Sequence, residues 1–282
     1  MKIKTPIAKG MNPEIKNTIP AIYMNPLIPI LILILFLTIG SNVRAQAPPA
    51  DAAASTPAPI PTGNLTQAQL IDILTKMGAD VKTEGDAPGG DITSVIFPYK
   101  HNKRLTPGGY PVPPYPITDD LVHQLSKLPK ITALELNMSN GLTEAAIKDV
   151  GSMKQLEHLS LSAGVHVNDT SMTDIAGLTK LNYLRLTGAS AVTPAGWATL
   201  QNFPRLKILW VAESSMNDQN IQQFKSLTML EDITLWGTSV TDAGGDVLLG
   251  LPNLKSVVLS PKMTHAETVK LQAALPNCRF RR

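Results

Sequence analysis

The amino-acid sequence predicts an α/β solenoid, a stack of strand-and-helix units, over the C-terminal two thirds of the chain. Three observations predict it: an internal repeat, an alternating leucine pattern at the start of each repeat, and apolar residues at helical spacing later in the same repeat. Successive repeat frames open 24 or 25 residues apart. Their first residues are Ile131, Leu156, Leu181, Leu206, Leu230 and Leu254, with a remnant at Cys278. A period of this length indicates stacked structural repeats and not a single globule.

Each frame contains a strand followed by a helix. The strand reads L-x-x-L-x-L, as in Leu230, Ile233 and Leu235, and its alternation has the period of an extended chain. After a turn, apolar residues recur at helical spacing, as in Ile221 and Phe224. One such unit cannot bury its apolar side alone, so neighbouring units must stack and share a core.

The frame over 230–254, LEDITLWGTSVTDAGGDVLLGLPNL, is the most regular copy. It resembles the leucine-rich repeat family, in the subclass with units L-x-L-x-G-T-x-V-T-D-A-G-L, close to the cysteine-containing type. The resemblance covers 92–282 and implies a right-handed β-α horseshoe arc of about seven repeats. The chain departs from the pattern at Gly245, where a helix leucine is expected, and at Ser214 and Thr238, where the subclass has cysteine or asparagine.

Residues 1–45 are predicted to be a signal peptide or membrane anchor. Four lysines precede an apolar run over 27–39, and Val43-Arg44-Ala45 offers a small-residue cleavage site. We expect cleavage and export, to a secreted or cell-envelope location. The alternative is an uncleaved anchor over 19–40, which is long enough to span a membrane, although three prolines weaken a single helix there.

The leader also carries the positive charge of the chain. The formal net charge is +3, and the five Lys/Arg and one Glu of the leader contribute +4, which leaves 3 − 4 = −1 for 46–282. The basic pI therefore gives no reason to expect a nucleic-acid partner. Because Cys278 is the only cysteine, no internal disulfide is possible, and stability must come from the stacked core.

Residues 46–63 form an Ala/Pro-rich linker with too few large apolar groups to fold, so we expect disorder. Residues 64–91 are predicted to be a helical N-terminal cap, because the end of a solenoid must be covered. Asn64 or Thr66 can begin its helix, and a first strand starts at Ile92. The predicted apolar face of that helix consists of Leu65, Ala68, Ile71, Leu74 and Met77.

Residues 98–116, PYKHNKRLTPGGYPVPPYP, interrupt the repeat. Six prolines prevent this segment from joining the sheet, so it is predicted to be an insertion loop at one edge. Its basic and aromatic side chains make it a second candidate for binding, toward an acidic or proline-recognising partner; the alternative is a solvated excursion. These side chains are Tyr99, Lys100, His101, Lys103, Arg104, Tyr110 and Tyr115.

The principal candidate site lies on the strands, at the positions between the consensus leucines. Those side chains face the concave side of the sheet and form rows across it, because adjacent strands lie about 4.8 Å apart. Two of the three tryptophans fall there, whereas Trp197 occupies a helix core position. Tryptophan, tyrosine and arginine are typical of binding hot spots; alternatively, these large side chains only cover one another. The candidate partner-binding residues are His158, Tyr183, Arg185, Ile208, Trp210, Asp232 and Trp236.

No catalytic, metal-binding or cofactor-binding residues are predicted, so we expect no enzyme. The five histidines are scattered without metal-ligand spacing, and the nucleophile, zinc and phosphate-binding motifs are absent. Four aspartates recur at predicted helix starts, which favours helix caps or turn formers. They are Asp119, Asp169, Asp218 and Asp242.

The resemblance to leucine-rich repeat proteins implies non-catalytic binding of a protein or peptide, and we expect a monomer. Two alternatives remain open. One is a substrate-recognition adaptor resembling the F-box leucine-rich repeat subunits of ubiquitin ligases, although no F-box precedes the repeats. The other is a structural surface protein tethered to the membrane through 19–40.

Overall fold

The computed structural model describes residues 63–87, 89–97, 117–137, 141–162 and 165–282. The predictions for the leader, for 46–62 of the linker and for the insertion at 98–116 lie outside the described residues. Among the helices that are described, none is both long and apolar enough to cross a membrane.

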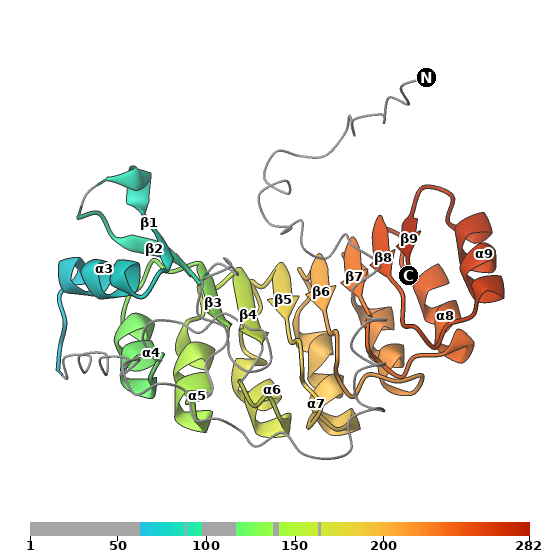
Figure 1. The fold of residues 1–282 in the computed structure, drawn as a ribbon, viewed down its shortest axis with the longest axis horizontal. Coiled ribbons are helices and arrows are strands. Elements are labelled where there is room, and N and C mark those ends of the chain that lie inside the picture. Colours follow the sequence, from blue (N-terminus) through green and yellow to red (C-terminus); the bar gives the residue numbers. More distant parts are fainter. Residues whose placement is uncertain (1–62, 88, 98–116, 138–140, 163–164) are drawn as a thin grey trace, which may run out of the picture. The chain divides into compact units, whose positions relative to one another are not determined.

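The described strands form one sheet, and their spatial order follows their sequence order from β1 to β9 (Figure 1). β1 pairs antiparallel with β2, and every later pair is parallel. The parallel register joins equivalent repeat positions, such as Leu159 with Leu184 and Leu184 with Leu209. It confirms the predicted α/β repeat solenoid. The strands are β1 (Asp80–Thr83), β2 (Ile92–Ile96), β3 (Ala133–Asn137), β4 (His158–Ser162), β5 (Tyr183–Arg185), β6 (Ile208–Trp210), β7 (Asp232–Thr234), β8 (Ser256–Val258) and β9 (Arg279–Arg281).

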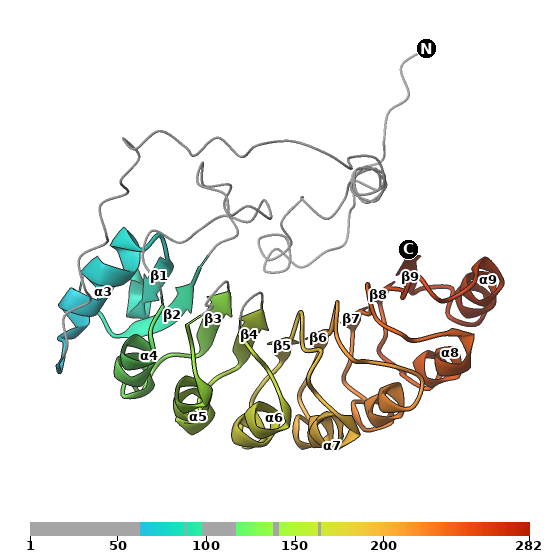
Figure 2. The ribbon, with the colours of Figure 1, turned by 60° about the horizontal axis from the view of Figure 1, so that its bottom comes forward.

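The helices of the repeats lie side by side in a second layer, on one side of the sheet (Figure 2). We call the opposite side of the sheet the concave face. The helical segments are α3 (Gln67–Lys76), η2 (Glu84–Asp86), α4 (Asp119–Ser126), α5 (Glu144–Ser152), α6 (Asp169–Ile175), α7 (Pro194–Ala198), η3 (Thr199–Asn202), η4 (Asn220–Ser226), α8 (Asp242–Leu249) and α9 (His265–Ala274). The η segments are 3₁₀ helices, so some repeats have only short turns in this layer.

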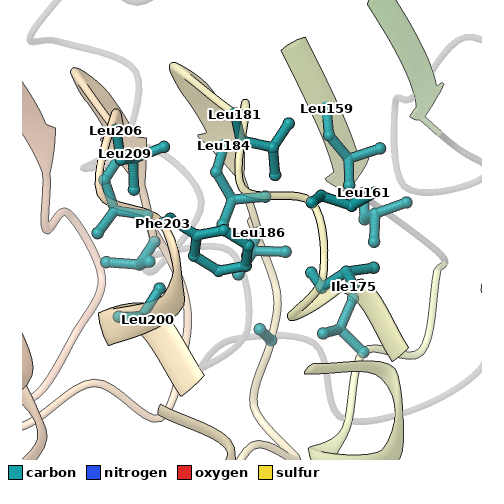
Figure 3. Packing of buried hydrophobic residues seen from close by; sticks show 14 of the residues in the cluster. Leu159, Leu161, Ile175, Leu181, Leu184, Leu186, Leu200, Phe203, Leu206 and Leu209 are labelled. Atoms are coloured by element: carbon teal, nitrogen blue, oxygen red, sulfur yellow. The ribbon is translucent and has the colours of Figure 1, made fainter. Parts of the chain in front are cut away.

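The core lies between the two layers. Each strand sends its consensus leucines toward the helices, and Leu184 and Leu186 of the central repeat are fully buried. Figure 3 shows Phe203 beside Leu186, with the leucines of the neighbouring strands in line. Burying one such side chain stabilises the fold by roughly 1.5–3 kcal/mol before the loss of entropy. Because every core layer touches the next, the repeats depend on one another for stability.

The N-terminal region differs from prediction in two respects. The helix α3 begins after Thr66, whose side chain and that of Gln69 form a capping box. Its buried residues are Leu70, Leu74 and Met77, whereas Ala68 is exposed, so the predicted apolar face was wrong at that position. The strand β1 was not predicted, and it makes the first strand pair antiparallel.

The recurring aspartates were predicted to be helix caps or turn formers, and they are not the capping residues of their own helices. The caps are threonine or asparagine residues, such as Thr118 before α4 and Thr241 before α8. Each aspartate instead accepts two hydrogen bonds from a threonine of the following repeat. Asp218, for example, accepts from the backbone N of Thr241 at 2.7 Å and from its Oγ1 at 2.6 Å. The same pair of bonds joins Asp119 to Thr143, Asp169 to Thr193 and Asp242 to Thr264.

The departure from the consensus at Gly245 has a local cause. A Cβ atom at this position would lie 2.2 Å from Oε1 of Glu267, whose side chain reaches α8 from α9. Glu267 is buried, and its carboxylate pairs with Lys270 at 3.2 Å. The carboxylate therefore occupies space that a leucine of α8 would need.

Candidate partner-binding site on the concave face

The seven candidate residues occupy neighbouring strands of the concave face. The register places them in rows, because His158 lies opposite Tyr183, Tyr183 opposite Ile208 and Arg185 opposite Trp210. We call His158, Tyr183, Arg185, Trp210 and Asp232 the concave cluster, since contacts between side chains join them. Ile208 lies in the same row between Tyr183 and Asp232. Trp236 follows β7 and is 42% exposed.

Aromatic stacking forms the centre of the concave cluster. The imidazole of His158 stacks on Tyr183 with ring centroids 3.8 Å apart and planes inclined by 4°. The ring of Trp210 lies tilted beside Tyr183, with centroids 5.8 Å apart. Adjacent strands are about 4.8 Å apart, which allows rings on successive strands to contact each other. The result is a series of contacting aromatic rings across β4, β5 and β6.

The side chains of the concave cluster differ in exposure. Tyr183 is only 5% exposed and Arg185 only 9%, whereas Trp210 is half-buried. His158 and Trp210 flank the tyrosine on its own face of the sheet and cover it. Burial accordingly raises the pKa of Tyr183 far above its usual range, with a smaller contribution from the charge of Glu135. The phenol therefore stays neutral.

A polar network holds the N-terminal side of the concave cluster. Glu135 on β3 lies 2.8 Å from Nε2 of His158, and it accepts a hydrogen bond from Asn137 at 2.8 Å. Ser160 donates to the Oδ1 atom of Asn137 at 2.8 Å. The predicted site residues did not include Glu135. Its position in the same row as Arg185 and Trp210 is the sequence signal that could have identified it. The network restricts the imidazole to its stacked position.

Arg185 provides the cationic part of the concave cluster. Its guanidinium carbon lies 5.3 Å from the centroid of Trp210, within the range of cation–π attraction. Its Nε donates to Oγ1 of Thr187 at 3.2 Å. The predicted pairing of arginine and tryptophan is therefore present, and the aromatic ring orients the guanidinium.

Asp232 supplies a carboxylate on the other side of Trp210. Its Oδ1 accepts a hydrogen bond from Nε1 of Trp210 at 3.2 Å. Burial raises its pKa above the usual value, partly opposed by hydrogen bonds from Trp210 and Ser256 and by the charge of Arg281. Ser256 on β8 and Arg281 on β9 were not among the predicted site residues, although both strands continue the sheet beside Asp232.

Replacing Asp232 with asparagine is expected to raise the free energy of unfolding at neutral pH by about 0.5–1 kcal/mol. The raised pKa means that ionisation opposes folding. The contribution of Asp232 to stability is most favourable below the ordinary aspartate pKa of about 3.9 and is lost as the pH rises through the raised folded-state pKa. An amide oxygen can still accept the Trp210 hydrogen bond. Urea denaturation across pH should show the gain shrinking in acid.

Asp246→Asn on α8 is the matched control for this substitution, because its side chain is 75% exposed. It should leave stability within about 0.5 kcal/mol at every pH. A loss of stability in Asp232→Asn at neutral pH would contradict the argument.

Among the described residues, no group of three or more His, Cys, Asp or Glu side chains could hold a metal ion. Trp197, predicted to be a core residue, is fully buried, and its Nε1 donates to Ser215 at 2.9 Å. The concave cluster consists of aromatic and charged side chains.

The sequence matches no protein-family model, and comparison with curated proteins yields no significant match. Among solved structures, the chain is similar to an internalin (inlF) of Listeria monocytogenes, with 18% identity and a TM-score of 0.41. That likeness covers 57% of this chain and half of the internalin chain. This chain is also similar to an internalin C2 (inlC2) of the same organism, with 17% identity and a TM-score of 0.48. That similarity covers 76% of this chain and 91% of the internalin C2 chain.

Proposed function

We propose that this protein is an exported, non-catalytic scaffold that binds a protein or peptide on the concave face of its solenoid. The observation that carries the proposal is the preorganised concave cluster, with an exposed tryptophan beside it. Trp, Tyr and Arg residues dominate binding hot spots. Trp and Tyr offer large contact areas with few rotatable bonds. Stacking and hydrogen bonds hold these side chains before any partner arrives, which lowers the entropy lost on binding.

The contacts of the titratable groups favour binding over catalysis. His158 faces a carboxylate and a phenol ring, not a hydroxyl or thiol nucleophile, and Asp232 accepts a hydrogen bond from an indole. These arrangements position side chains and do not join a base to a nucleophile.

The remaining parts of the proposal come from the sequence. We propose leucine-rich repeats of the cysteine-containing-like subclass, about seven in number, with α3 as the N-terminal cap. The leader over 1–45 directs export to the cell envelope or the exterior, and the chain acts as a monomer.

The test uses a phage library of random linear peptides, selected on the full-length protein. Peptides that bind the concave face should bind the Trp210→Ala/Trp236→Ala variant at least about tenfold more weakly, since hot-spot tryptophans contribute 2 kcal/mol or more. Trp236→Ala alone is the cleaner variant, because this side chain is exposed and its loss should leave the melting temperature unchanged. Fluorescence polarisation measures the affinity.

Met229→Ala/Val269→Ala is the matched control, because it removes two other exposed apolar side chains, 41% and 55% exposed, away from the concave cluster. Equal binding by the tryptophan variant and the wild type would reject the proposed site.

A further inference from the structure

Arg185 and Asp232 carry opposite charges on the strands either side of Trp210, and neither is in an ion pair. The ion pairs among the described residues join other side chains. Arg185 is only 9% exposed, yet its described partners are only a threonine hydroxyl, the Tyr183 phenol and an indole ring. A guanidinium that is buried without a counter-ion is costly and offers unused donors to an anion.

Asp232 is the complementary case. It accepts hydrogen bonds from Trp210 and Ser256, both of which are neutral groups. The guanidinium of Arg281 acts on it from a distance but donates its own hydrogen bond to Ser256, at 3.1 Å. The carboxylate therefore remains available to a cation that approaches from the concave side.

We propose that the partner is an extended polypeptide segment that crosses the strands of the concave face, with an acidic side chain at Arg185 and a basic side chain at Asp232. This inference rests on the proposed function. Trp210 and Ile208 lie between the two charges and would contact an apolar side chain of the segment.

Geometry fixes the spacing of the two charges in the partner. Arg185 is on β5 and Asp232 on β7, two strand spacings or about 10 Å apart across the sheet. Asp232 lies in the row of Tyr183 and Ile208, which is two residues or about 7 Å along the strand from Arg185, so the two positions are about 12 Å apart. An extended chain advances about 3.3 Å per residue, so the acidic and basic residues should be about three or four positions apart. A polypeptide offers both signs at this spacing, whereas a nucleic acid offers only phosphates, which Asp232 would repel.

Peptides selected from the random library on the full-length wild-type protein are the probe. They should be enriched in an acidic and a basic residue about three or four positions apart, consistent with the separation of Arg185 and Asp232. Against a selected peptide, Arg185→Gln and Asp232→Asn should each weaken binding at least tenfold. Lys255→Gln and Asp246→Asn change the same charges at exposed sites that are paired with Glu231 and Lys270, and they should leave the affinity unchanged.

A charge reversal separates pairing from a structural effect. Arg185→Glu should lose the selected peptide and bind a version whose acidic residue is replaced by lysine. If the tryptophan variant loses the peptides but the peptides lack the charge pair, or bind Arg185→Gln and Asp232→Asn normally, the inference fails and the proposed function stands. If no selected peptide depends on the tryptophans, both fail.

Discussion

Replacing Gly151 with alanine is expected to lower the free energy of unfolding by about 3 kcal/mol or more. Gly151 lies in α5, where a Cβ atom would come within 2.3 Å of the backbone oxygen of Asp174 and 2.8 Å of its carbonyl carbon. Backbone atoms cannot rotate aside as a flexible side chain can. The helices α5 and α6 would have to separate, and each tightly packed contact between their repeats would weaken.

Gly250→Ala is the matched control, because Gly250 has an ordinary φ of −83° and the nearest atom to its Cβ would be 3.5 Å away. That variant should lie within about 0.5 kcal/mol of wild type or be slightly more stable, because alanine restricts the unfolded chain. Urea denaturation followed by both circular dichroism and tryptophan fluorescence compares the two variants and tests whether the repeats still unfold together. Equal stabilities of Gly151→Ala and Gly250→Ala would contradict the predicted clash.

The positions of the parallel strands from β3 to β8 could be predicted from the spacing of the leucines. Alternation identifies the strand and its inward face, and the repeat interval sets the register, because stacked units place equivalent residues opposite each other. The strand β1 lacks such a pattern: its residues alternate between exposed and half-buried positions without a run of large apolar side chains. β1 becomes a strand by pairing with the otherwise open edge of β2. The sequence pattern within β1 does not indicate that contact with another strand.

The composition of the candidate site was also predictable, but the burial of its side chains was not. Row position brought Tyr183, Arg185 and Trp210 together correctly. Their exposure depends on rotamers and on neighbours across three strands. Tyr183 becomes buried through stacking on His158, and that stacking in turn depends on Glu135. Such contacts require the coordinates of several strands at once.

The recurring aspartates near the helix starts make contacts between repeats and not within one. Thr241 caps α8, and Gly244 leaves space for the carboxylate of the preceding repeat, since a Cβ there would lie 2.8 Å from Oδ1 of Asp218. The Thr193 bonds lower the pKa of Asp169 from its usual value, and the Thr264 bonds do the same for Asp242, so both stay ionised at neutral pH. At four positions, an aspartate at or just before one helix start thus bonds to a threonine at the start of the next helix.

Replacing Asp119 with alanine is therefore expected to lower the free energy of unfolding by about 2 kcal/mol, because two charge-assisted hydrogen bonds to Thr143 are lost. Asp120→Ala is the control within the same first turn of α4. Both substitutions remove one negative charge near the start of the helix dipole, so that effect cancels between them.

Asp120 is exposed, and its loss should change stability by no more than about 0.5 kcal/mol. Urea denaturation of the two variants measures the difference, and a double variant with Thr143→Val tests its origin. If the carboxylate acts through Thr143, Thr143→Val should lower the free energy of unfolding far less in the Asp119→Ala variant than in the wild type. Full additivity would mean that Asp119 stabilises α4 alone and that its bonds to Thr143 do not join the two repeats.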